Sequence, residues 1–166
     1  SRSSVGTLPV TISTLTRKLG VSEGTANFVA SFGSTAGMQG CAGVFPAMLI
    51  IFVSNSSGTP IDLTLLIMSV IVISIGSLGI AGIPGTATMA ASVALSGTGM
   101  AASFPLISPI LAIDPIIDMG RSCLNVSGAM VNALYVDKRL GLLNNSSYDD
   151  PELVKLSTDN ETDMEN

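Results

Sequence analysis

Long apolar stretches without charge dominate the chain. No Asp, Glu, Lys or Arg occurs within residues 24–61 or within residues 63–113. A helix of about 20 apolar residues crosses the hydrocarbon layer of a bilayer, and the stretch at 24–53 exceeds that length. A soluble domain could not build its surface from such residues. The pattern therefore predicts an all-α membrane protein.

Three other apolar runs are too short to cross a bilayer. Each holds about ten to thirteen residues, and they lie at 10–19, 63–75 and 86–95. The first follows a turn of small residues at Ser3-Ser4, and the other two flank the glycine-rich segment 77–85. Short arms joined by such tips are typical of helical hairpins that enter and leave a membrane on one side. We predict two re-entrant helical hairpins, with 1–19 as the end of the first and 62–96 as the second.

The spanning stretch 24–53 contains an unusual segment, Gly37-Met-Gln-Gly-Cys-Ala-Gly43, near its middle. Three glycines and a Gln weaken a helix there. Irregular backbone at membrane depth is tolerated where it lines a cavity, and its freed carbonyl groups can bind ions. We predict a broken transmembrane helix at 24–53. A continuous helix with a glycine-rich packing face is the alternative.

The last apolar segment carries a polar stripe, and we predict it as one long transmembrane helix at 106–136. At about 100° per residue, five polar side chains fall within one arc: Asp114, Asp118, Arg121, Ser122 and Asn125. Ionisable groups are costly in a membrane helix, so the stripe is expected to face protein or a water-filled cavity. It indicates a binding or translocation site. An Asp–Arg ion pair that only fixes helix packing is the simpler alternative.

Composition agrees with a membrane protein and excludes several kinds of chemistry. The chain is 47% hydrophobic and 11% charged, has a mean hydropathy of +0.60 and contains no His. Its two cysteines, Cys41 and Cys123, lie in apolar stretches, which favours packing roles over a disulfide or a metal pair. We expect no cofactor, no catalysis by His, metal or thiol clusters, and no nucleic acid as a partner.

The net charge of −5 arises at the C-terminal end. Residues 147–166 contain seven acids and one Lys, whereas the preceding residues contain five acids and six bases. We predict that 141–166 forms a disordered acidic tail. Basic pairs at 17–18 and 138–139, together with loops at 54–61 and 96–104 that lack Lys and Arg, predict a cytoplasmic tail. The expected location is the cell's inner (plasma) membrane, crossed several times.

Four motifs in order resemble the dicarboxylate/amino acid:cation symporter family. They are Ser-Ser-Val-Gly-Thr-Leu-Pro-Val-Thr at 3–11, Ser-Glu-Gly at 22–24, Gly-Ile-Ala-Gly-Ile-Pro-Gly at 79–85 and Asp-Pro-Ile-Ile-Asp-Met-Gly-Arg-Ser-Cys-Leu-Asn-Val-Ser-Gly at 114–128. The resemblance implies that 1–140 is the C-terminal half of an elevator-type transport domain, in a homotrimer formed through an N-terminal scaffold. Because the chain opens without Met or a leader, we expect a C-terminal piece of a longer protein.

The same resemblance implies an amino-acid site and suggests its substrate. The segments 40–48 and 124–128 are most similar to those of the bacterial L-cystine uptake carriers, so cation-coupled import of L-cystine is the expected function. The implied substrate-binding residues are Ser3, Ser4, Gly82, Asp114, Asp118, Arg121, Ser122 and Asn125. Asp118 would hold the α-ammonium group. Asn125 and the Ser3-Ser4 turn would hold the α-carboxylate.

Arg121 would bind a second, distal carboxylate through its planar guanidinium, and Asp114 would orient it. L-Cystine offers such a carboxylate, but so do glutamate and aspartate. A glutamate/aspartate or C4-dicarboxylate symporter of the same family therefore remains the alternative.

The chain departs from the sodium-coupled acidic amino acid carriers at two positions. Gln39 and Ala129 stand where those relatives have sodium-binding aspartates. Because Na⁺ prefers oxygen ligands, the loss of two anionic ones weakens its expected binding. A neutral cation site could be built from carbonyl groups of Gly37, Met38, Gln39, Ser77, Leu78 and Ile80. Na⁺ or H⁺ is the expected coupling ion, with less dependence on sodium than in those relatives.

Two other classes of function fit some of these features. An intramembrane aspartyl protease also needs two membrane acids, but Asp114 and Asp118 share one helix beside Arg121, which opposes proton sharing between them. A pore-lining or structural membrane subunit would carry a polar stripe that binds nothing. We predict a transporter and not an enzyme.

Overall fold

The computed structural model describes residues 2–148, and every regular element in that range is a helix. The elements are α1 (Leu8–Arg17), α2 (Glu23–Ala36), the π-helical turn η1 (Gln39–Val44), α3 (Phe45–Ser57), α4 (Leu63–Ser77), α5 (Thr86–Gly97), the 3₁₀ turn η2 (Ala101–Ile107), α6 (Ser108–Leu140) and α7 (Asn145–Tyr148). With no strand in this described range, the predicted all-α class is confirmed.

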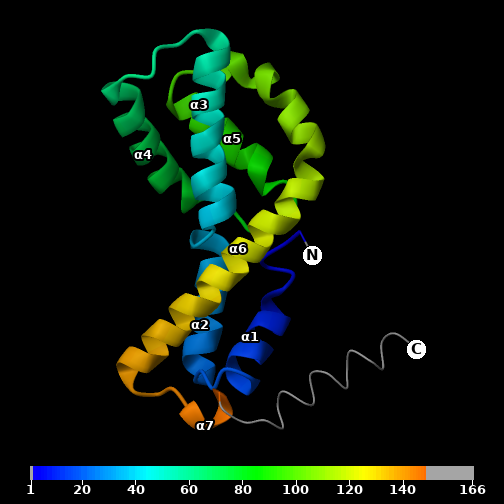
Figure 1. The fold of residues 1–166 in the computed structure, drawn as a ribbon, viewed down its shortest axis with the longest axis vertical. Coiled ribbons are helices and arrows are strands. Elements are labelled where there is room, and N and C mark those ends of the chain that lie inside the picture. The colour runs from blue at the N-terminus through cyan, green and yellow to red at the C-terminus, as the bar shows by residue number, and fades with distance from the viewer. Residues whose placement is uncertain (1, 149–166) are drawn as a thin grey trace, which may run out of the picture.

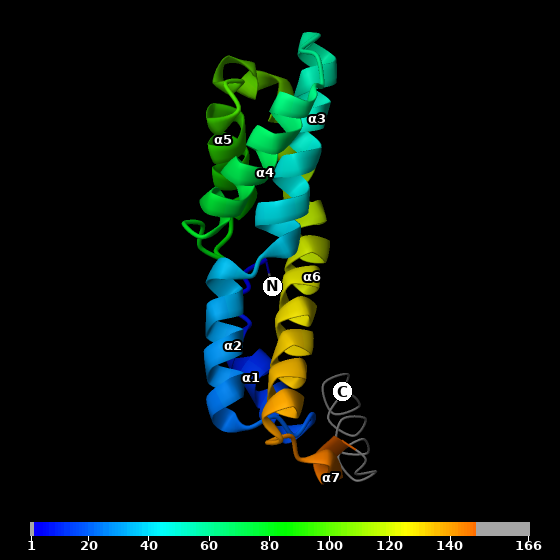
Figure 2. The same ribbon diagram turned by 90° about the vertical axis from the view of Figure 1, so that its left-hand side faces the viewer.

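Helix α6 runs along most of the length of an elongated bundle (Figure 1). Helices α1 and α2 pack beside its C-terminal half, and α3, α4 and α5 form the other end (Figures 1 and 2). Each end has its own apolar cluster of buried side chains. One contains Leu15, Val21, Ala26, Ala30 and Ala133, and the other includes Leu49, Ile50, Val53, Ala91, Leu95 and Ile107. The polar stripe of α6 lies between the two clusters.

The predicted break in the helix at 24–53 is present. Helix α2 ends at Ala36, and Gly37 and Met38 then leave helical geometry, with ψ angles of 29° and 67°. The π-helical turn η1 follows before α3 begins at Phe45, and Figure 2 shows the chain stepping sideways between α2 and α3. In a π turn each backbone hydrogen bond spans one residue more than in an α-helix, and such turns are frequent at functional sites.

Helices α4 and α5 form a tight pair joined by the tip at 78–85 (Figure 1). A Cβ atom on Gly76 would lie 2.6 Å from Val93 Cγ1, and one on Gly97 would lie 2.4 Å from Val72 Cγ1. Small residues at these two points therefore let the helices approach closely. Asp62 caps α4, because its Oδ1 accepts a hydrogen bond of 2.8 Å from Leu65 N. The short arms agree with a hairpin; its re-entrant course, like that of α1, remains a prediction.

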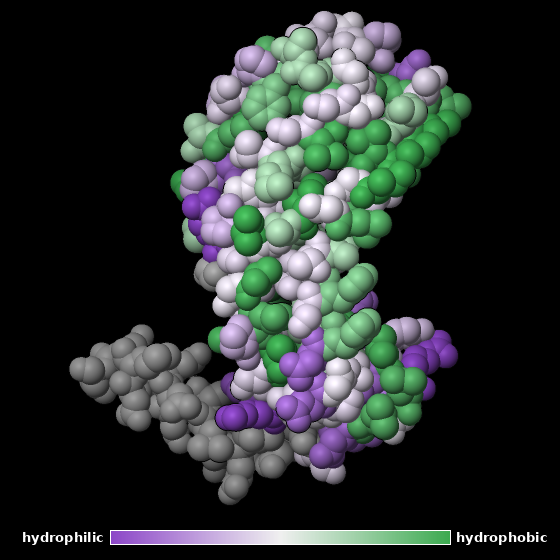
Figure 3. All heavy atoms as spheres, turned by 180° about the vertical axis from the view of Figure 1, so that it is seen from behind, coloured by the Kyte–Doolittle hydropathy of each residue, from purple (hydrophilic) through white to green (hydrophobic). Residues whose placement is uncertain are grey.

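The outer surface of α4 is apolar on nearly all sides. Its exposed side chains include Leu63, Leu66, Ile67, Val70, Ile71 and Ile75, and its one buried residue is Ser69. Figure 3 shows these hydrophobic side chains as a continuous green band on the side where α4 lies. Helix α4 is too short to cross a membrane, but two other helical stretches, Glu23–Ser57 and Ala101–Leu140, are long and apolar enough to do so. An apolar exterior of this kind suits lipid contact.

The last helix is longer than the predicted 106–136. It begins at Ser108, after η2, and continues to Leu140, where Gly141 ends it with a φ of 70°. The first charged residue beyond the predicted end at 136 is Asp137. Asp137 is fully buried. Pro115 lies inside α6, which Figure 1 shows curved along its first half, as expected where a proline removes a helical hydrogen bond.

Asp137 joins the end of α6 to the start of α2. Its Oδ2 accepts a hydrogen bond of 2.8 Å from Ser22 N, and its Oδ1 accepts one of 2.6 Å from Ser22 Oγ. Ser22 is the N-cap residue of α2 but makes no cap bond with its own side chain, so Asp137 supplies the cap from another helix. Nearby, Asn144 N donates to Gly20 O at 2.9 Å.

Part of the predicted disordered segment 141–166 has a defined structure. Residues 145–148 form α7, and the preceding residues contact the turn between α1 and α2. The remainder of the predicted tail, from residue 149 onward, lies outside the described residues.

We expect Asp137→Ala to lower the free energy of unfolding by about 2–4 kcal/mol, because it removes two charge-assisted hydrogen bonds and leaves the half-buried Ser22 N without its partner. Thermal unfolding of the purified protein in detergent measures the loss. Asp62→Ala, which removes the exposed cap of α4, is the matched control and should have a smaller effect. Equal losses in the two variants would mean that Asp137 does not join the two helices.

Candidate functional site

The five predicted polar residues of α6 are all buried. Their exposed fractions are 5% for Asp114, 3% for Asp118, 9% for Arg121, 6% for Ser122 and 1% for Asn125. Other faces of the helix are apolar and exposed, for example at Ile116 with 71%. The stripe packs against α2 and η1, so the broken helix meets the charged part of α6.

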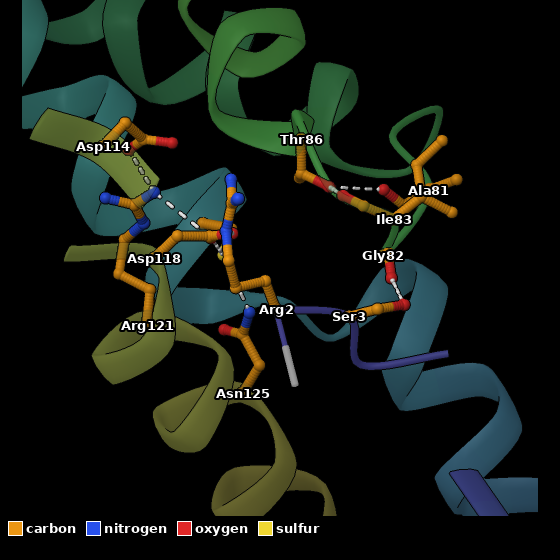
Figure 4. A network of polar contacts seen from close by, with 11 residues as sticks. Arg2, Ser3, Ala81, Gly82, Ile83, Thr86, Asp114, Asp118, Arg121 and Asn125 are labelled. Atoms are coloured by element: carbon orange, nitrogen blue, oxygen red, sulfur yellow. Dashed lines mark hydrogen bonds and ion pairs between the residues drawn. The ribbon is translucent and has the colours of Figure 1, made fainter. Parts of the chain in front are cut away.

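Arg121 connects the two acids of the stripe. Its Nη2 donates to Asp114 Oδ1 and lies 3.2 Å from Asp118 Oδ1 (Figure 4). The guanidinium carbon lies 4.2 Å from the ring centroid of Phe45, a cation–π contact that holds the group flat. Its Nε and Nη1 are buried and have no hydrogen-bond partner among residues 2–148. Two buried, unused donors on a cation indicate an anionic ligand.

Two hydrogen bonds join η1 to α6. Gln39 Nε2 donates to the backbone oxygen of Leu124 at 2.8 Å, and the backbone N–H of Gly40 donates to Asn125 Oδ1 at 2.8 Å. Both donors belong to the broken segment, one from a side chain and one from the backbone, and both acceptors belong to α6. Gly128 makes room for this junction, because a Cβ atom there would lie 1.9 Å from Gln39 Nε2.

Asn125 also contacts a thiol. Its Nδ2 donates to Cys41 Sγ at 3.0 Å, and the same sulfur lies 3.8 Å from Asp118 Oδ1. Sulfur is a weak acceptor, so Asn125 Nδ2 loses little when it gives up this hydrogen bond and donates to a better acceptor, such as a carboxylate oxygen.

The tip of the α4–α5 hairpin touches the turn that precedes α1. The backbone oxygen of Gly82 accepts hydrogen bonds from Ser3 Oγ at 2.9 Å and from Val5 N at 3.2 Å (Figure 4). A Cβ atom on Gly82 would lie 2.2 Å from Ser34 O, so only glycine permits this approach. Two segments that are 79 residues apart are therefore in contact beside the stripe of α6.

Ser4 and Asn125 line one small cavity together with Ala129. Its volume of about 10 Å³ is the least that a single water molecule requires. Two of the residues predicted to hold a carboxylate are therefore neighbours.

The predicted cation ligands are only partly brought together. Gly37, Met38, Gln39 and Ser77 line a cavity of about 210 Å³, to which α6 adds Asn132. Ile80 is instead buried beside Met38, and Leu78 is 66% exposed. Neither lines that cavity.

Sequence reasoning missed three residues at or near the site. Arg2 lies with its Nε 3.4 Å from Asp118 Oδ2, Phe45 packs on Arg121, and Asn132 lines the cavity just described. For Arg2 a signal was present, since it directly precedes the Ser3-Ser4 turn that was assigned to the site. Phe45 and Asn132 could not be recognised, because their roles depend on how α3 and α6 pack.

Buried carboxylates, an arginine with unused donors and a broken helix in an apolar bundle are together typical of sites in membrane transporters. Residues 1–139 match the model of the sodium:dicarboxylate symporter family, and the chain belongs to this family. That membership places it among transporters and not among enzymes, which removes the protease alternative.

The similar curated proteins are named for L-cystine uptake. The chain is 45% identical over 154 residues to the L-cystine uptake protein TcyP of Shouchella clausii. The aligned region covers 91% of this chain and 32% of the relative. The chain is 44% identical over 151 residues to TcyP of Bacillus licheniformis and 42% identical over 149 residues to TcyP of Bacillus anthracis, with 90% and 89% of this chain covered. In each case the chain spans about a third of the relative's length.

Gly128→Ala should displace Gln39 from Leu124 and weaken the junction between η1 and α6, because the new Cβ atom would overlap Gln39 Nε2. We expect the free energy of unfolding to fall by about 1 kcal/mol, the amount that one neutral hydrogen bond contributes. Thermal unfolding of the purified protein in detergent measures it.

Gly120→Ala is the matched control, because it lies on the same helix and a Cβ atom there would meet no other atom within 4 Å. It should leave the junction intact and stabilise the helix slightly. Equal effects of the two substitutions would exclude a specific role for the junction between η1 and α6.

Proposed function

We propose that this chain forms the substrate-binding part of the transport domain of a secondary active transporter that imports an amino acid, L-cystine, by cation-coupled symport. The observation that carries the proposal is the buried acid–arginine stripe of α6, with Arg121 Nε and Nη1 unpartnered among the described residues. The names of the similar proteins support L-cystine as the substrate. An elevator-type movement of this domain in a homotrimer is part of the same proposal.

Asp118 and Asn125 bind the amino-acid end of the substrate in this proposal. Asp118 takes the α-ammonium, since its carboxylate is buried at the level where the helix breaks. Asn125 Nδ2 exchanges its weak contact with Cys41 for an oxygen of the α-carboxylate. The turn at Ser3-Ser4 gives further donors to that carboxylate once the contact with Gly82 opens.

The distal carboxylate of the substrate binds Arg121. The first contact uses a donor that is now unpaired, either Nε or Nη1. A bidentate contact through Nη2 requires Arg121 to loosen its bond with Asp114 or Asp118. Asp114 thereby orients the guanidinium of Arg121 before the substrate binds, and it competes with the substrate for that group. Ser122 is buried on the same face of α6.

Glutamate and aspartate also offer two carboxylates and one ammonium, so Arg121 alone does not exclude them. C4-dicarboxylates fit less well, because they bring no ammonium to Asp118. A pore-lining or structural subunit is disfavoured by the close contact between Gly82 and Ser3, which closes the site instead of leaving a continuous path.

Coupling in this proposal depends less on sodium than in the acidic amino acid carriers. Gln39 already gives its side-chain amide to Leu124, and Ala129 has no oxygen ligand in its side chain. The remaining cation site is neutral and uses backbone oxygens of Gly37, Met38 and Gln39 with Ser77. Na⁺ or H⁺ is the coupling ion, and the C-terminal end is cytoplasmic in a multi-pass protein of the inner membrane.

The tip at 78–85 should act as a lid that protects the bound substrate. Ala81 is exposed while the adjacent Gly82 is buried against Ser34. A cysteine at Ala81 should react with an aqueous thiol reagent added from outside, and saturating L-cystine should slow that reaction. The background is Cys123, which is exposed, so labelling is measured against a Cys123→Ala parent. Equal labelling rates with and without substrate would mean that the tip is static.

The function itself is tested by radiolabelled uptake into proteoliposomes that contain the complete polypeptide. Wild-type protein should import L-cystine, and uptake should persist in part when choline replaces Na⁺. Arg121→Ala should abolish uptake, and Arg121→Lys should restore little, because an ammonium lacks the planar geometry of the guanidinium.

Arg139→Ala is the control for the loss of one positive charge from α6, since within residues 2–148 the Arg139 guanidinium contacts the exposed Tyr135 and no acid of the stripe. It should transport normally. Uptake of glutamate but not L-cystine would contradict the substrate assignment. Complete and steep dependence on Na⁺ would contradict the coupling assignment, and a linear, unsaturable flux would indicate a pore.

A further inference from the structure

Arg2 reaches the centre of the candidate site from outside α6. Its Nε lies 3.4 Å from Asp118 Oδ2, and Figure 4 shows its side chain lying between the Ser3 turn and the α6 stripe. The Nε atom is buried, yet the contact does not have the geometry of a hydrogen bond. Arg2 and Asp118 therefore form an ion pair that no hydrogen bond orients.

Asp118 consequently meets a different arginine at each oxygen. Oδ1 lies 3.2 Å from Arg121 Nη2, and Oδ2 lies 3.4 Å from Arg2 Nε. With Asp114 bound to Arg121, two carboxylates and two guanidinium groups form one cluster without net charge. A charge-balanced cluster is far less costly in an apolar bundle than an unpaired carboxylate.

The two arginines are held very differently. The side chain of Arg121 is 10% exposed, bonds to two acids and stacks on Phe45. That of Arg2 is 37% exposed, makes one long ion pair among residues 2–148 and belongs to the irregular segment before α1. When a new cation approaches Asp118, Arg2 is the partner that can leave toward solvent.

We propose that Arg2 is a tethered cation that occupies the ammonium position of the empty site and is displaced by the α-ammonium group of the substrate. The inference rests on the proposed function, which assigns that ammonium to Asp118. Displacement keeps the charge around Asp118 constant, because one cation replaces another. It also moves the Ser3 turn, since Arg2 precedes it directly, and so links substrate binding to the contact between Ser3 and Gly82.

Because Arg2 stabilises only the empty site, its removal should strengthen binding. Arg2→Ala should bind L-cystine about two- to fivefold more tightly, the ratio that a partly exposed ion pair is worth. The melting temperature of the empty variant should fall below that of wild type, and saturating L-cystine should restore equality. Arg2→Lys keeps the charge and should retain an affinity close to that of wild type.

The measurements are isothermal titration with L-cystine and thermal unfolding with and without it, on the complete polypeptide in detergent. Arg17→Ala, which removes an exposed charge at the end of α1, is the control and should change neither quantity. Unchanged or weaker binding by Arg2→Ala, or an equal fall in melting temperature with and without substrate, overturns the role of Arg2 while the proposed function stands. Failure of the wild-type protein to bind L-cystine or any other amino acid overturns both.

Discussion

Neutralisation of buried charge is the constraint on which the rest of this structure depends. Asp114 and Asp118 are almost fully buried in a bundle whose exterior is apolar, and an unpaired carboxylate in such a place costs several kcal/mol. Arg121 must therefore lie on the same face of α6, within two turns of both acids. This requirement fixes the rotation of α6, which in turn determines that Asn125 faces the broken helix. The geometry of the site follows from charge balance and helical spacing together.

The break between α2 and α3 is stable because another helix satisfies its polar groups. In a continuous helix the N–H of Gly40 would donate to a carbonyl four residues earlier, but the chain is not helical there. Asn125 accepts that hydrogen bond instead, and Gln39 donates a second one to the backbone oxygen of Leu124 in α6. An unsatisfied backbone group would be costly in the hydrocarbon layer, so the broken helix and the polar stripe require each other.

Much of the architecture could be predicted from the sequence, because it depends on local patterns. The polar spacing of α6, the glycine-rich break and the short arms around the tip at 78–85 are visible in the chain itself. The end of α6 could not be predicted, since Asp137 is kept buried by Ser22, a partner 115 residues away. The same holds for Phe45, whose contact with Arg121 arises from packing between helices. Leu78 and Ile80, two further predicted cation ligands, do not line the cavity that Gly37, Met38, Gln39 and Ser77 line, and the sequence could not show this because the course of a glycine-rich tip is not determined by its own residues.

Three interruptions of regular backbone meet at one level of α6, and this convergence links binding to closure. They are the Ser3 turn, the break at Gly37–Met38 and the tip at Gly82. Each leaves backbone groups that need partners. Gly82 O at the tip accepts a hydrogen bond from the turn before α1, and Asn125 of α6 accepts one from the segment after the break. A ligand that enters must break some of these contacts, so it is retained only if its own ammonium and carboxylate groups replace what was lost. A zwitterionic amino acid carries both kinds of group on adjacent atoms. The site is thus closed by the same hydrogen-bonding groups that would recognise its substrate, and an ion lacking either group has less to offer in exchange.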